Sequence, residues 1–545
     1  MDVDEMQKKL ATWADNDPSH RFFDIYHLLY EREWLARAYG AVKSNSGSST
    51  AGVDGIDAST FEKNLWENLE DLAQELRNGS YDPKPVRRMY IPKGDGRKRP
   101  LGIPTIKDRI VQEALRMVLE PIYETDFSQY SYGFRPNRST HDALNVVKIA
   151  TRESSKYFWV IDADIKGFFD NVDHQTLEQI TQKRLKDQKV RDLIWKFLKA
   201  GIMEEGKYRH SMVGTPQGGI VSPLLANIYL NELDQWVKQY TDRSRRQKRK
   251  YRKKGSGNWM YVRYADDFIM LTNGRKQDAE KMKNRLIEYL DTELDLTLSK
   301  KKTNITHVND GLDFLGFHVE RDENSKSEMQ TQITIPKESI DDFREKIHVA
   351  TDRSQMNTSE SKKILALNAL IRGWGNYYRH CWSAASTFNS LDHFIWKRMM
   401  HWIAGKHKTS VKKATKRLEM NDKTRIKVGN RELVRLQDLE TKPYRKKIFK
   451  EHPYLEKVSL EREKLPEERP WLGDEGNRAG FGDQRFKALE RDDWTCQSCG
   501  KDLNGKVAEV HHRKPVKEFS NPKEANRLDN LETLCADCHK ATHTK

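Results

Sequence analysis

The chain has 545 residues, of which 36% are hydrophobic and 33% charged, and its formal net charge is +16 with a sequence pI near 9.3. This length predicts roughly three or four domains, and the basic excess favours a nucleic-acid partner, since each neutralised phosphate releases counterions. No apolar stretch has membrane-spanning length, and the acidic N-terminus lacks the apolar core of a signal peptide. We therefore expect an intracellular protein with no membrane partner.

Two strand-like segments in the first half of the chain end in carboxylates. In residues 158–170 an apolar run ends at Asp164. In residues 260–271, Asp266 and Asp267 lie between two short apolar runs, which predicts a hairpin with both acids at its tip. Adjacent carboxylates repel unless a cation neutralises them, so neighbouring strands would let these acids hold two Mg²⁺ ions for phosphoryl transfer. For the Asp-Asp pair alone, a solvated turn is the commoner explanation.

A strongly basic run lies just before the second carboxylate segment. Between Arg243 and Lys254 nine of twelve residues are basic and none is acidic, and Gly255-Ser256-Gly257 follows. Because like charges repel, the run is not expected to fold on its own. It predicts a mobile insertion that grips RNA, and a solubilising loop is the alternative.

After residue 317 the pattern changes to helical periodicity. Apolar side chains recur at steps of three and four residues, with Arg372, Arg379 and His380 among them, which indicates a helical-bundle core with a basic face. Residues 406–475 are rich in Lys, Arg and Glu and have no clear motif, as expected of solvated helices and linkers. The apolar stripe comprises Leu367, Leu370, Ile371, Trp374, Tyr377, Tyr378 and Cys381.

Four of the five cysteines lie near the C-terminus, in two Cys-x-x-Cys pairs. In an intracellular basic protein this pairing predicts a tetrahedral structural Zn²⁺ rather than disulfides. The four predicted ligands are Cys496, Cys499, Cys535 and Cys538.

Histidines lie between and after these cysteine pairs. His511 and His512 end a strand-like segment, while His539 and His543 are spaced to share one face of a helix. Three imidazoles, those of His511, His539 and His543, could hold one divalent ion and leave His512 free. A neutral histidine beside a metal-bound phosphate can deprotonate water for hydrolysis.

Several blocks in the first 320 residues resemble those of group II intron-encoded reverse transcriptase/maturases. The pair Asp266-Asp267, preceded by Tyr264-Ala265, resembles the metal-binding box of reverse transcriptases, and Asp164 matches their other catalytic aspartate. Lys301 stands where the family usually has Glu. The order and spacing of the blocks are far more specific than any single one. The further matching blocks are residues 99–104, 132–136, 214–230, 298–303 and 314–317.

The resemblance implies roles for individual residues. Asp164, Asp266 and Asp267 would bind Mg²⁺, with Asp267 the less direct ligand. Phe169 would lie under the incoming sugar and exclude a 2′-hydroxyl, whereas the adjacent Phe168 is equally well explained as a core aromatic. The nucleotide pocket would also contain Gln217, Gly218, Arg97, Arg99 and Lys302. The three basic residues among them could equally be solvated surface charges.

The rest of the chain extends the resemblance. Residues 372–379 resemble the thumb of intron maturases, called domain X, and residues 406–475 occupy the position of the family's DNA-binding region. The C-terminal histidines resemble HNH endonucleases, which implies His512 as general base and Asn530 as its orienter. His511, His539 and His543 would then bind Mg²⁺ or Mn²⁺. An all-structural zinc domain that binds DNA without cleaving it is the alternative.

These observations predict a multidomain α+β protein. We expect a right-hand polymerase with fingers and palm in residues 1–330, a helical thumb or domain X in 331–405, a DNA-binding region and linker in 406–475, and a zinc-stabilised ββα-metal HNH domain in 476–545. The predicted function combines RNA-directed DNA polymerase, splicing maturase and site-specific DNA endonuclease in target-primed reverse transcription. The alternatives are an RNA-binding splicing cofactor with a vestigial polymerase, or a domesticated reverse transcriptase. The partners would be group II intron RNA, target DNA, an RNA template with a DNA primer, and dNTPs, in the bacterial cytoplasm or nucleoid.

Overall fold

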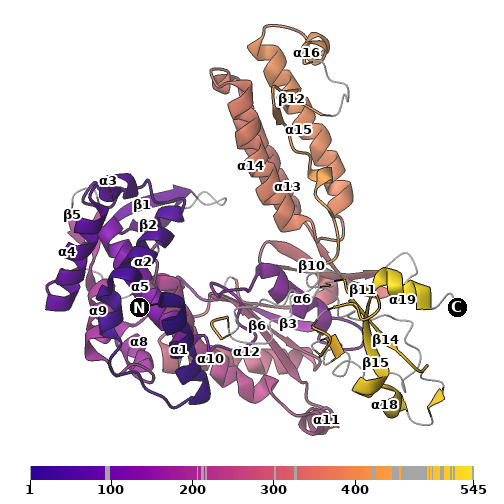
Figure 1. Ribbon diagram of the computed structural model, residues 1–545, viewed down its shortest axis with the longest axis horizontal. Coiled ribbons are helices and arrows are strands. Elements are labelled where there is room, and N and C mark those ends of the chain that lie inside the picture. Colours follow the sequence, from indigo (N-terminus) through magenta and orange to yellow (C-terminus); the bar gives the residue numbers. More distant parts are fainter. Residues whose placement is uncertain are drawn as a thin grey trace. The chain divides into compact units, whose positions relative to one another are not determined.

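A computed structural model describes most of the chain, and its described residues fall into two compact units (Figure 1). The first unit contains the described residues up to 444 together with 453–455, and the second contains those from 488 onward. Each unit is treated by itself. The described residues are 2–92, 98–204, 207–209, 214, 218–253, 255–299, 302–323, 328–418, 425–444, 453–455, 488–489, 491–493, 495–501, 503, 508–515, 518–519 and 522–542.

The N-terminal part of the first unit is a group of helices beside a small sheet of order β2-β1-β4-β5. Its central helix, α5, begins at Thr105, whose hydroxyl accepts a hydrogen bond from the Asp108 N–H, and it is buried on nearly every side. Packing of α1 and α2 against α5 forms the first hydrophobic core. The elements are α1 (Val3–Asn16), α2 (Arg32–Ser44), α4 (Leu65–Asn78), β1 (Val86–Pro92), β2 (Lys98–Ile103), α5 (Ile106–Tyr123), β4 (Ile202–Glu204) and β5 (Lys207–Arg209).

A four-stranded antiparallel sheet of order β6-β7-β3-β8 holds the predicted carboxylates. Because strand side chains alternate between faces, Ile161 and Phe268 pack into the first core beside α10 and α12. Val160 and Ile269 point the other way, into a second core that includes α6. The elements are α6 (Thr140–Ala150), β3 (Trp159–Asp164), α10 (Ser222–Thr241), β6 (Trp259–Tyr264), β7 (Asp267–Thr272), α12 (Lys276–Leu294) and β8 (Asn304–His307).

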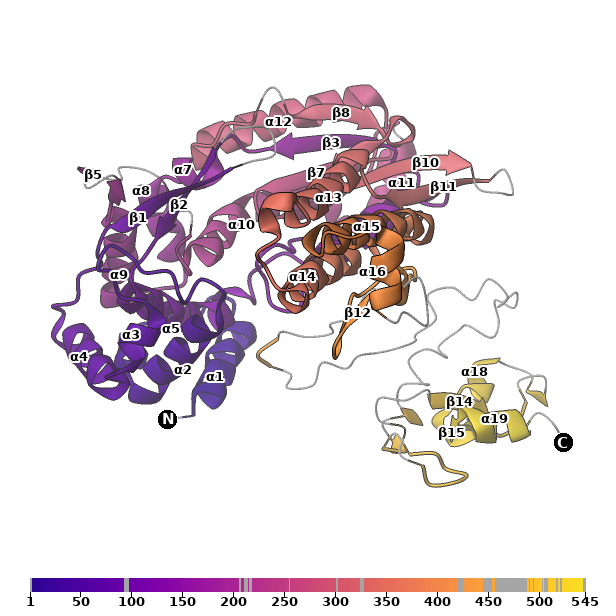
Figure 2. The same ribbon diagram turned by 90° about the horizontal axis from the view of Figure 1, so that it is seen from above.

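Three long helices and a three-stranded sheet complete the second core. Helices α13, α14 and α15 lie side by side (Figures 1 and 2), and Trp374 of α14 stacks on Phe343 of α13 with ring centroids 4.5 Å apart. The predicted helical stripe is confirmed for Leu367 and Ile371, which are fully buried, whereas Cys381 lies beyond the end of the helix. The elements are β9 (Leu312–Phe314), β10 (Phe317–Glu323), β11 (Met329–Thr334), α13 (Lys337–Ala350), α14 (Glu360–Tyr378) and α15 (Ala384–Lys406).

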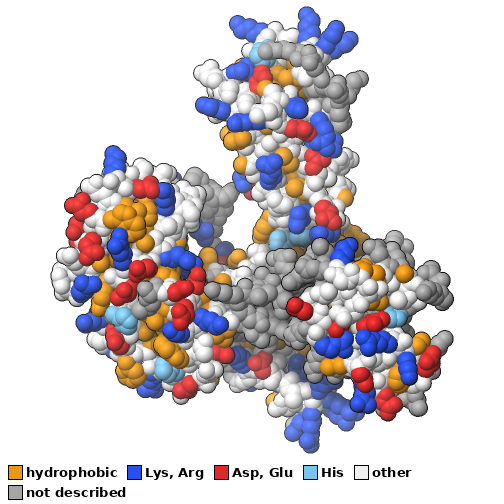
Figure 3. All heavy atoms as spheres, in the orientation of Figure 1, with side chains coloured by type: hydrophobic (Ala, Val, Ile, Leu, Met, Phe, Trp, Pro, Cys, Tyr) orange, Lys and Arg blue, Asp and Glu red, His pale blue; other side chains and the backbone are white. Residues whose placement is uncertain are grey.

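The basic run forms a helix, α11 (Arg245–Lys253), which corrects the prediction that it would not fold. None of its residues is buried, and its Lys and Arg side chains project at the lower edge of the view in Figure 3. Its neighbours hold it in place, because the Arg243 guanidinium lies 3.7 Å from the centroid of the Tyr251 ring and the Asn258 amide donates to the Lys248 carbonyl.

Part of the predicted DNA-binding region packs back on α14. After α16 (Val411–Arg417), a two-stranded sheet of β12 (Lys427–Val428) and β13 (Arg431–Glu432) is held by the Asn368 amide, which donates to the Glu432 carbonyl. Residues 419–424, 445–452 and 456–475 of this region lie outside the described residues. In the part of the chain that is described, we find no helix with the length and apolar character of a membrane span.

The second unit is built on an antiparallel hairpin of β14 and β15. Among its described residues, one apolar cluster contains Ala488, Leu489, Val510 and Leu531, and the other contains Leu503 and Leu534 with cysteines. The described part of this core is small, and small domains commonly depend on a bound metal or disulfides for stability. The elements are β14 (Ala508–His512), α18 (Pro522–Ala525), β15 (Leu531–Cys535) and α19 (Ala536–Thr542).

Candidate active sites

The three predicted polymerase carboxylates meet at one end of the central sheet. Asp164, the last residue of β3, lies directly opposite Asp267, the first residue of β7, and Asp266 occupies the two-residue turn between β6 and β7. The expectation that the two strands are neighbours is therefore confirmed. The Lys302 ammonium contacts Asp164 Oδ1 at 3.0 Å, so a residue predicted to bind phosphate lies at this site.

Burial and mutual repulsion make this end of the sheet unfavourable for negative charge. Burial, with the charges of Asp266 and Asp164, raises the pKa of Asp267 to about 6, and burial also raises the pKa of Asp266. The positive charges of Lys302 and Arg99 oppose both shifts. A divalent cation would relieve the repulsion, because it stabilises the ionised carboxylates.

A fourth acid, Asp162, lies on the same face and was not predicted. Burial first, and then the charges of Asp267 and Asp164, raise its pKa to about 7. The sequence did contain the signal, since Asp162 precedes Asp164 by two residues and alternate strand residues share a face.

A buried network holds the carboxylate turn in place. The Arg263 side chain in β6 and the Asp234 side chain in α10 are both fully buried and share two hydrogen bonds of 2.8 and 2.6 Å. Arg263 Nη1 also donates to the Ala265 carbonyl and to Asn227 Oδ1, each at 2.9 Å. Ala265 adopts a φ of +57°, a region that costs a non-glycine residue about 1–3 kcal/mol and persists only where its surroundings fix it.

Gly133 lies against the same turn. A Cβ atom at this position would be 2.3 Å from the Ala265 nitrogen, so only glycine fits. The Asn227 amide donates to the Gly133 carbonyl at 2.8 Å, which connects this segment to the Arg263 network. Arg263, Asp234 and Asn227 were not predicted, because an isolated charged residue in a strand-like run does not reveal its partner.

The predicted nucleotide-pocket residues are only partly described. Phe168 is 2% exposed and belongs to the core, whereas Phe169 is half-buried at the edge of that core. Gly218 has a φ of +118° and lies so close to the β2 backbone that a Cβ would be 2.3 Å from the Gly102 carbonyl oxygen. Gln217 and Arg97 lie outside the described residues.

The four cysteines form a compact cluster in the second unit. Their sulfur atoms all lie within 4.8 Å of one another, and no other set of three or more potential ligands in the described ranges is as tight. Burial raises the pKa of the Cys496 thiol, but hydrogen bonds from backbone amides outweigh it and hold this pKa at about 6. Thiolate sulfur is the form that binds a metal, so the cluster can hold a metal ion.

The predicted nuclease histidines lie on neighbouring elements of the same unit. The rings of His511 in β14 and His539 in α19 have centroids 5.4 Å apart, while His543 lies outside the described residues. The expected contact between Asn530 and His512 is not found. Instead, the Asn530 amide oxygen accepts from the Lys514 N–H, and its nitrogen donates to the Lys514 and Ala525 carbonyls. These bonds fix the loop that follows β14. His512 Nε2 is hydrogen-bonded to the Asn526 side chain at 2.9 Å.

Comparison with known families gives three matches along the chain. Residues 91–319 match the family described as reverse transcriptase (RNA-dependent DNA polymerase). Residues 340–419 match the group II intron, maturase-specific domain, and residues 496–545 match the HNH endonuclease family.

Similar proteins agree with these matches. The group II intron-encoded protein LtrA of Lactococcus lactis subsp. cremoris is 35% identical over 465 residues, which cover 72% of this chain and 76% of LtrA. The chain belongs to the group II intron-encoded proteins. Protein YkfC of Escherichia coli (strain K12) is 41% identical over 361 residues, covering 63% of this chain and 95% of YkfC. An uncharacterized 91 kDa protein in the cob intron of Schizosaccharomyces pombe is 31% identical over 411 residues, 64% of this chain and 50% of that protein.

This group II intron-encoded protein is therefore multifunctional, with reverse transcriptase, maturase and HNH endonuclease domains on one mixed α/β chain. The membership also confirms the enzyme classes expected from the sequence, a reverse transcriptase and an endonuclease. Reverse transcriptases and HNH endonucleases are generally metal-dependent, which agrees with the clustered carboxylates and cysteines described above.

Proposed function

We propose that Asp164, Asp266 and Asp267 form the polymerase site and copy intron RNA into DNA from a primer end. The observation that carries this proposal is the register that sets Asp164 opposite Asp267 with Asp266 in the adjoining turn. These residues fit two Mg²⁺ ions, because the carboxylates are oxygen ligands whose pKa values are raised by burial and by one another. When bound, the ions would supply activation of the primer 3′-hydroxyl and neutralise charge on the leaving pyrophosphate.

The remaining residues of the site position the nucleotide. The primer oxygen attacks the α-phosphorus, the bond to the β-phosphate oxygen breaks, and pyrophosphate leaves. Arg99 and Lys302 would hold the triphosphate, for which Lys302 must leave its ion pair with Asp164. Phe169 would exclude the 2′-hydroxyl, and Gln217, Gly218 and Arg97 would complete the pocket.

We assign fingers and palm to residues 1–330, thumb or domain X to 331–405, the DNA-binding region to 406–475 and the HNH domain to 476–545. The antiparallel palm-like sheet and the three long helices that follow it support this division. Four thiolates favour Zn²⁺ as the metal of the cysteine cluster. The partners would be intron RNA, a DNA target, and an RNA template with its DNA primer.

For the endonuclease, His512 would deprotonate water beside a Mg²⁺ or Mn²⁺ ion held by His511, His539 and His543. The proximity of the His511 and His539 rings supports a shared ligand role. Asn526 would orient His512, since it makes the contact expected of Asn530. Nicking one DNA strand frees a 3′-hydroxyl, which can then prime reverse transcription of the intron RNA.

Extension of a DNA primer on an RNA template tests the polymerase proposal. Asp266→Asn should abolish extension, whereas Asp71→Asn, which changes an exposed acid of α4, should extend like the native chain. Extension that survives Asp266→Asn would reject the carboxylate assignment. If the native chain binds structured RNA but never extends, the splicing cofactor with a vestigial polymerase becomes the better proposal.

Nicking of supercoiled plasmid DNA with Mg²⁺ or Mn²⁺ tests the nuclease proposal. His512→Ala should lose nicking but keep DNA binding and the cysteine-bound metal. Unchanged nicking would reject His512 as the base. In a separate comparison, the nicking rates of Asn526→Ala and Asn530→Ala would show which amide supports the reaction.

A further inference from the structure

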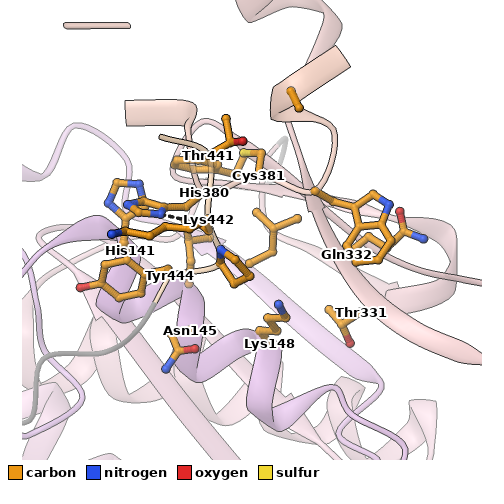
Figure 4. A pocket seen from close by; sticks show the side chains of 16 residues that line it. His141, Asn145, Lys148, Thr331, Gln332, His380, Cys381, Thr441, Lys442 and Tyr444 are labelled. Carbon is orange, nitrogen blue, oxygen red and sulfur yellow. Dashed lines mark hydrogen bonds between the residues drawn. The ribbon is translucent and has the colours of Figure 1, made fainter. Parts of the chain in front are cut away.

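A cavity of about 220 Å³ lies in the first unit where α6, β11, the residues between α14 and α15, and residues 441–444 meet (Figure 4). None of the proposed polymerase or nuclease residues lines it. Its lining includes His141, Asn145, Lys148, Gln332, Trp382 and Tyr444. We call it the α6–β11 pocket.

The α6–β11 pocket has several buried polar side chains within a mainly apolar lining. Asn145, Thr331 and Gln332 are 7%, 5% and 8% exposed. The amide nitrogen of Asn145 has no hydrogen-bond partner. Buried polar groups nearly always have partners, because an unmet donor costs about 1–3 kcal/mol. The Asn145 nitrogen is itself inaccessible to solvent, so it lies behind the cavity wall rather than facing the cavity.

Its charge is positive and uncompensated. No acidic residue lines the cavity, and within the described residues no hydrogen bond or ion pair satisfies the Lys148 ammonium. Burial, together with Arg152, lowers the pKa of Lys148, as expected of an amine without an anion beside it. Lys442 differs, since it pairs with Glu440 at 2.9 Å. Figure 4 shows Lys148 reaching up from α6 between the side formed by His141 and Tyr444 and the side formed by Thr331.

The walls are fixed and the mouth carries an exposed aromatic ring. The His141 ring stacks on Tyr444 with centroids 5.2 Å apart, and His380 Nδ1 is hydrogen-bonded to the Lys442 carbonyl at 2.7 Å. The Trp382 side chain is 62% exposed, while its backbone N–H donates to the Ile333 carbonyl. An exposed indole beside a cavity, on a backbone fixed by this bond, is a stacking surface for a base.

We propose that the α6–β11 pocket binds one unpaired nucleotide of RNA, with its phosphate on Lys148 and its base on Trp382. The Lys148 ammonium is a donor with no anion beside it, so the ligand must present acceptor oxygens, and a phosphate supplies them together with a negative charge. The cavity is smaller than the roughly 300–1,000 Å³ of pockets for drug-sized ligands, which suits one sugar-phosphate with the base outside. The inference rests on the proposed function for RNA as partner.

Fluorescence anisotropy of the full chain with a short labelled single-stranded RNA, measured over a range of salt concentrations, tests this proposal. Lys148→Met should weaken binding about tenfold and make the slope of log K against log salt less negative by about 0.7, the value for one phosphate contact on a single strand. Lys148→Arg should restore both. Trp382→Ala should weaken binding about 5- to 150-fold without changing the slope, because stacking releases no counterions.

Two control variants remove similar groups elsewhere. Lys63→Met and Trp13→Ala change exposed residues of the first unit and should bind like the native chain. Native affinity and slope for Lys148→Met, or native affinity for Trp382→Ala, would overturn the proposal. If uridine monophosphate displaces the RNA at equal nucleotide concentration, the pocket is a free-nucleotide site instead. Primer extension by the native chain reports separately on the proposed function, so either can fail alone.

Discussion

The buried pair of Arg263 and Asp234 gives the sharpest prediction about the sheet that holds the carboxylates. Asp234 accepts two hydrogen bonds from Arg263 and one, at 2.9 Å, from the Tyr261 hydroxyl, and the paired side chains are wholly inaccessible to solvent. Burial lowers the pKa of Arg263, but the charge of Asp234 raises it by more, so the guanidinium stays charged. Asp234→Asn removes the counter-charge but keeps an acceptor, so we expect a loss near the lower end of the ~3–5 kcal/mol seen when a buried pair is broken.

That loss is a large fraction of the ~5–15 kcal/mol stability of a typical domain. Urea unfolding of the full chain should show it, and amide hydrogen exchange should show faster opening of β6 and β7. Asp291→Asn, an exposed acid-to-amide change in α12, is the matched control. A stability within about 0.5 kcal/mol of the native chain, the range of ordinary surface substitutions, would refute the reasoning.

A double variant separates stability from positioning. Replacing both partners with apolar residues of similar size, as Arg263→Met with Asp234→Leu, is often neutral or stabilising. The double variant should therefore regain only part of the stability, because the Tyr261 hydroxyl loses its acceptor. It should not regain primer extension, because the bonds from Arg263 to Ala265 and Asn227 are gone. Native extension by this variant would show that Arg263 has no positioning role.

Three further predictions concern pH, sugar selection and metal. Burial raises the pKa of Asp267 to about 6 and of Asp162 to about 7 from 3.8, so the metal-free folded chain binds more protons than the unfolded chain in this window. Stability in EDTA should therefore fall as pH rises from about 4 to 7, and Mg²⁺ should restore it most at the upper end; a flat profile by thermal unfolding would contradict this. Phe169→Val should increase ribonucleotide incorporation in primer extension, and unchanged discrimination against ribonucleotides would remove its proposed role. Cys499→Ser should release the metal proposed for the cysteine cluster, measured by atomic absorption, and unfold the second unit while extension persists, because metal binding at such a site is coupled to folding.

The sequence predicted the parts of the sites that follow from local pattern. Alternation along the strands and the turn between them located Asp164, Asp266 and Asp267, and cysteine spacing located the metal cluster. Helical periodicity likewise predicted the buried stripe of α14, although the helix ends at Tyr378.

What the sequence could not give depends on tertiary contacts. The sequence does not show that Arg263 is buried, because its partner Asp234 comes from α10. The contact between Asn526 and His512 likewise depends on the folded chain, because spacing along the sequence does not reveal it. The basic run was expected not to fold because only its own charges were considered. Arg243 stacks on Tyr251 within the run, and the Asn258 amide beyond the run donates to the Lys248 carbonyl.

The Arg263 network also limits how this enzyme can change. Residues around Gly133, the middle of α10 and the turn after β6 share hydrogen bonds through Asn227, so none of the three can be exchanged without the other two. A chimera that takes only the carboxylate hairpin from a relative would contain the turn without the matching residues near Gly133 and in α10 that hydrogen-bond to its surroundings. Transplanting all three segments together should preserve activity, because the hydrogen bonds that join them would be transferred intact.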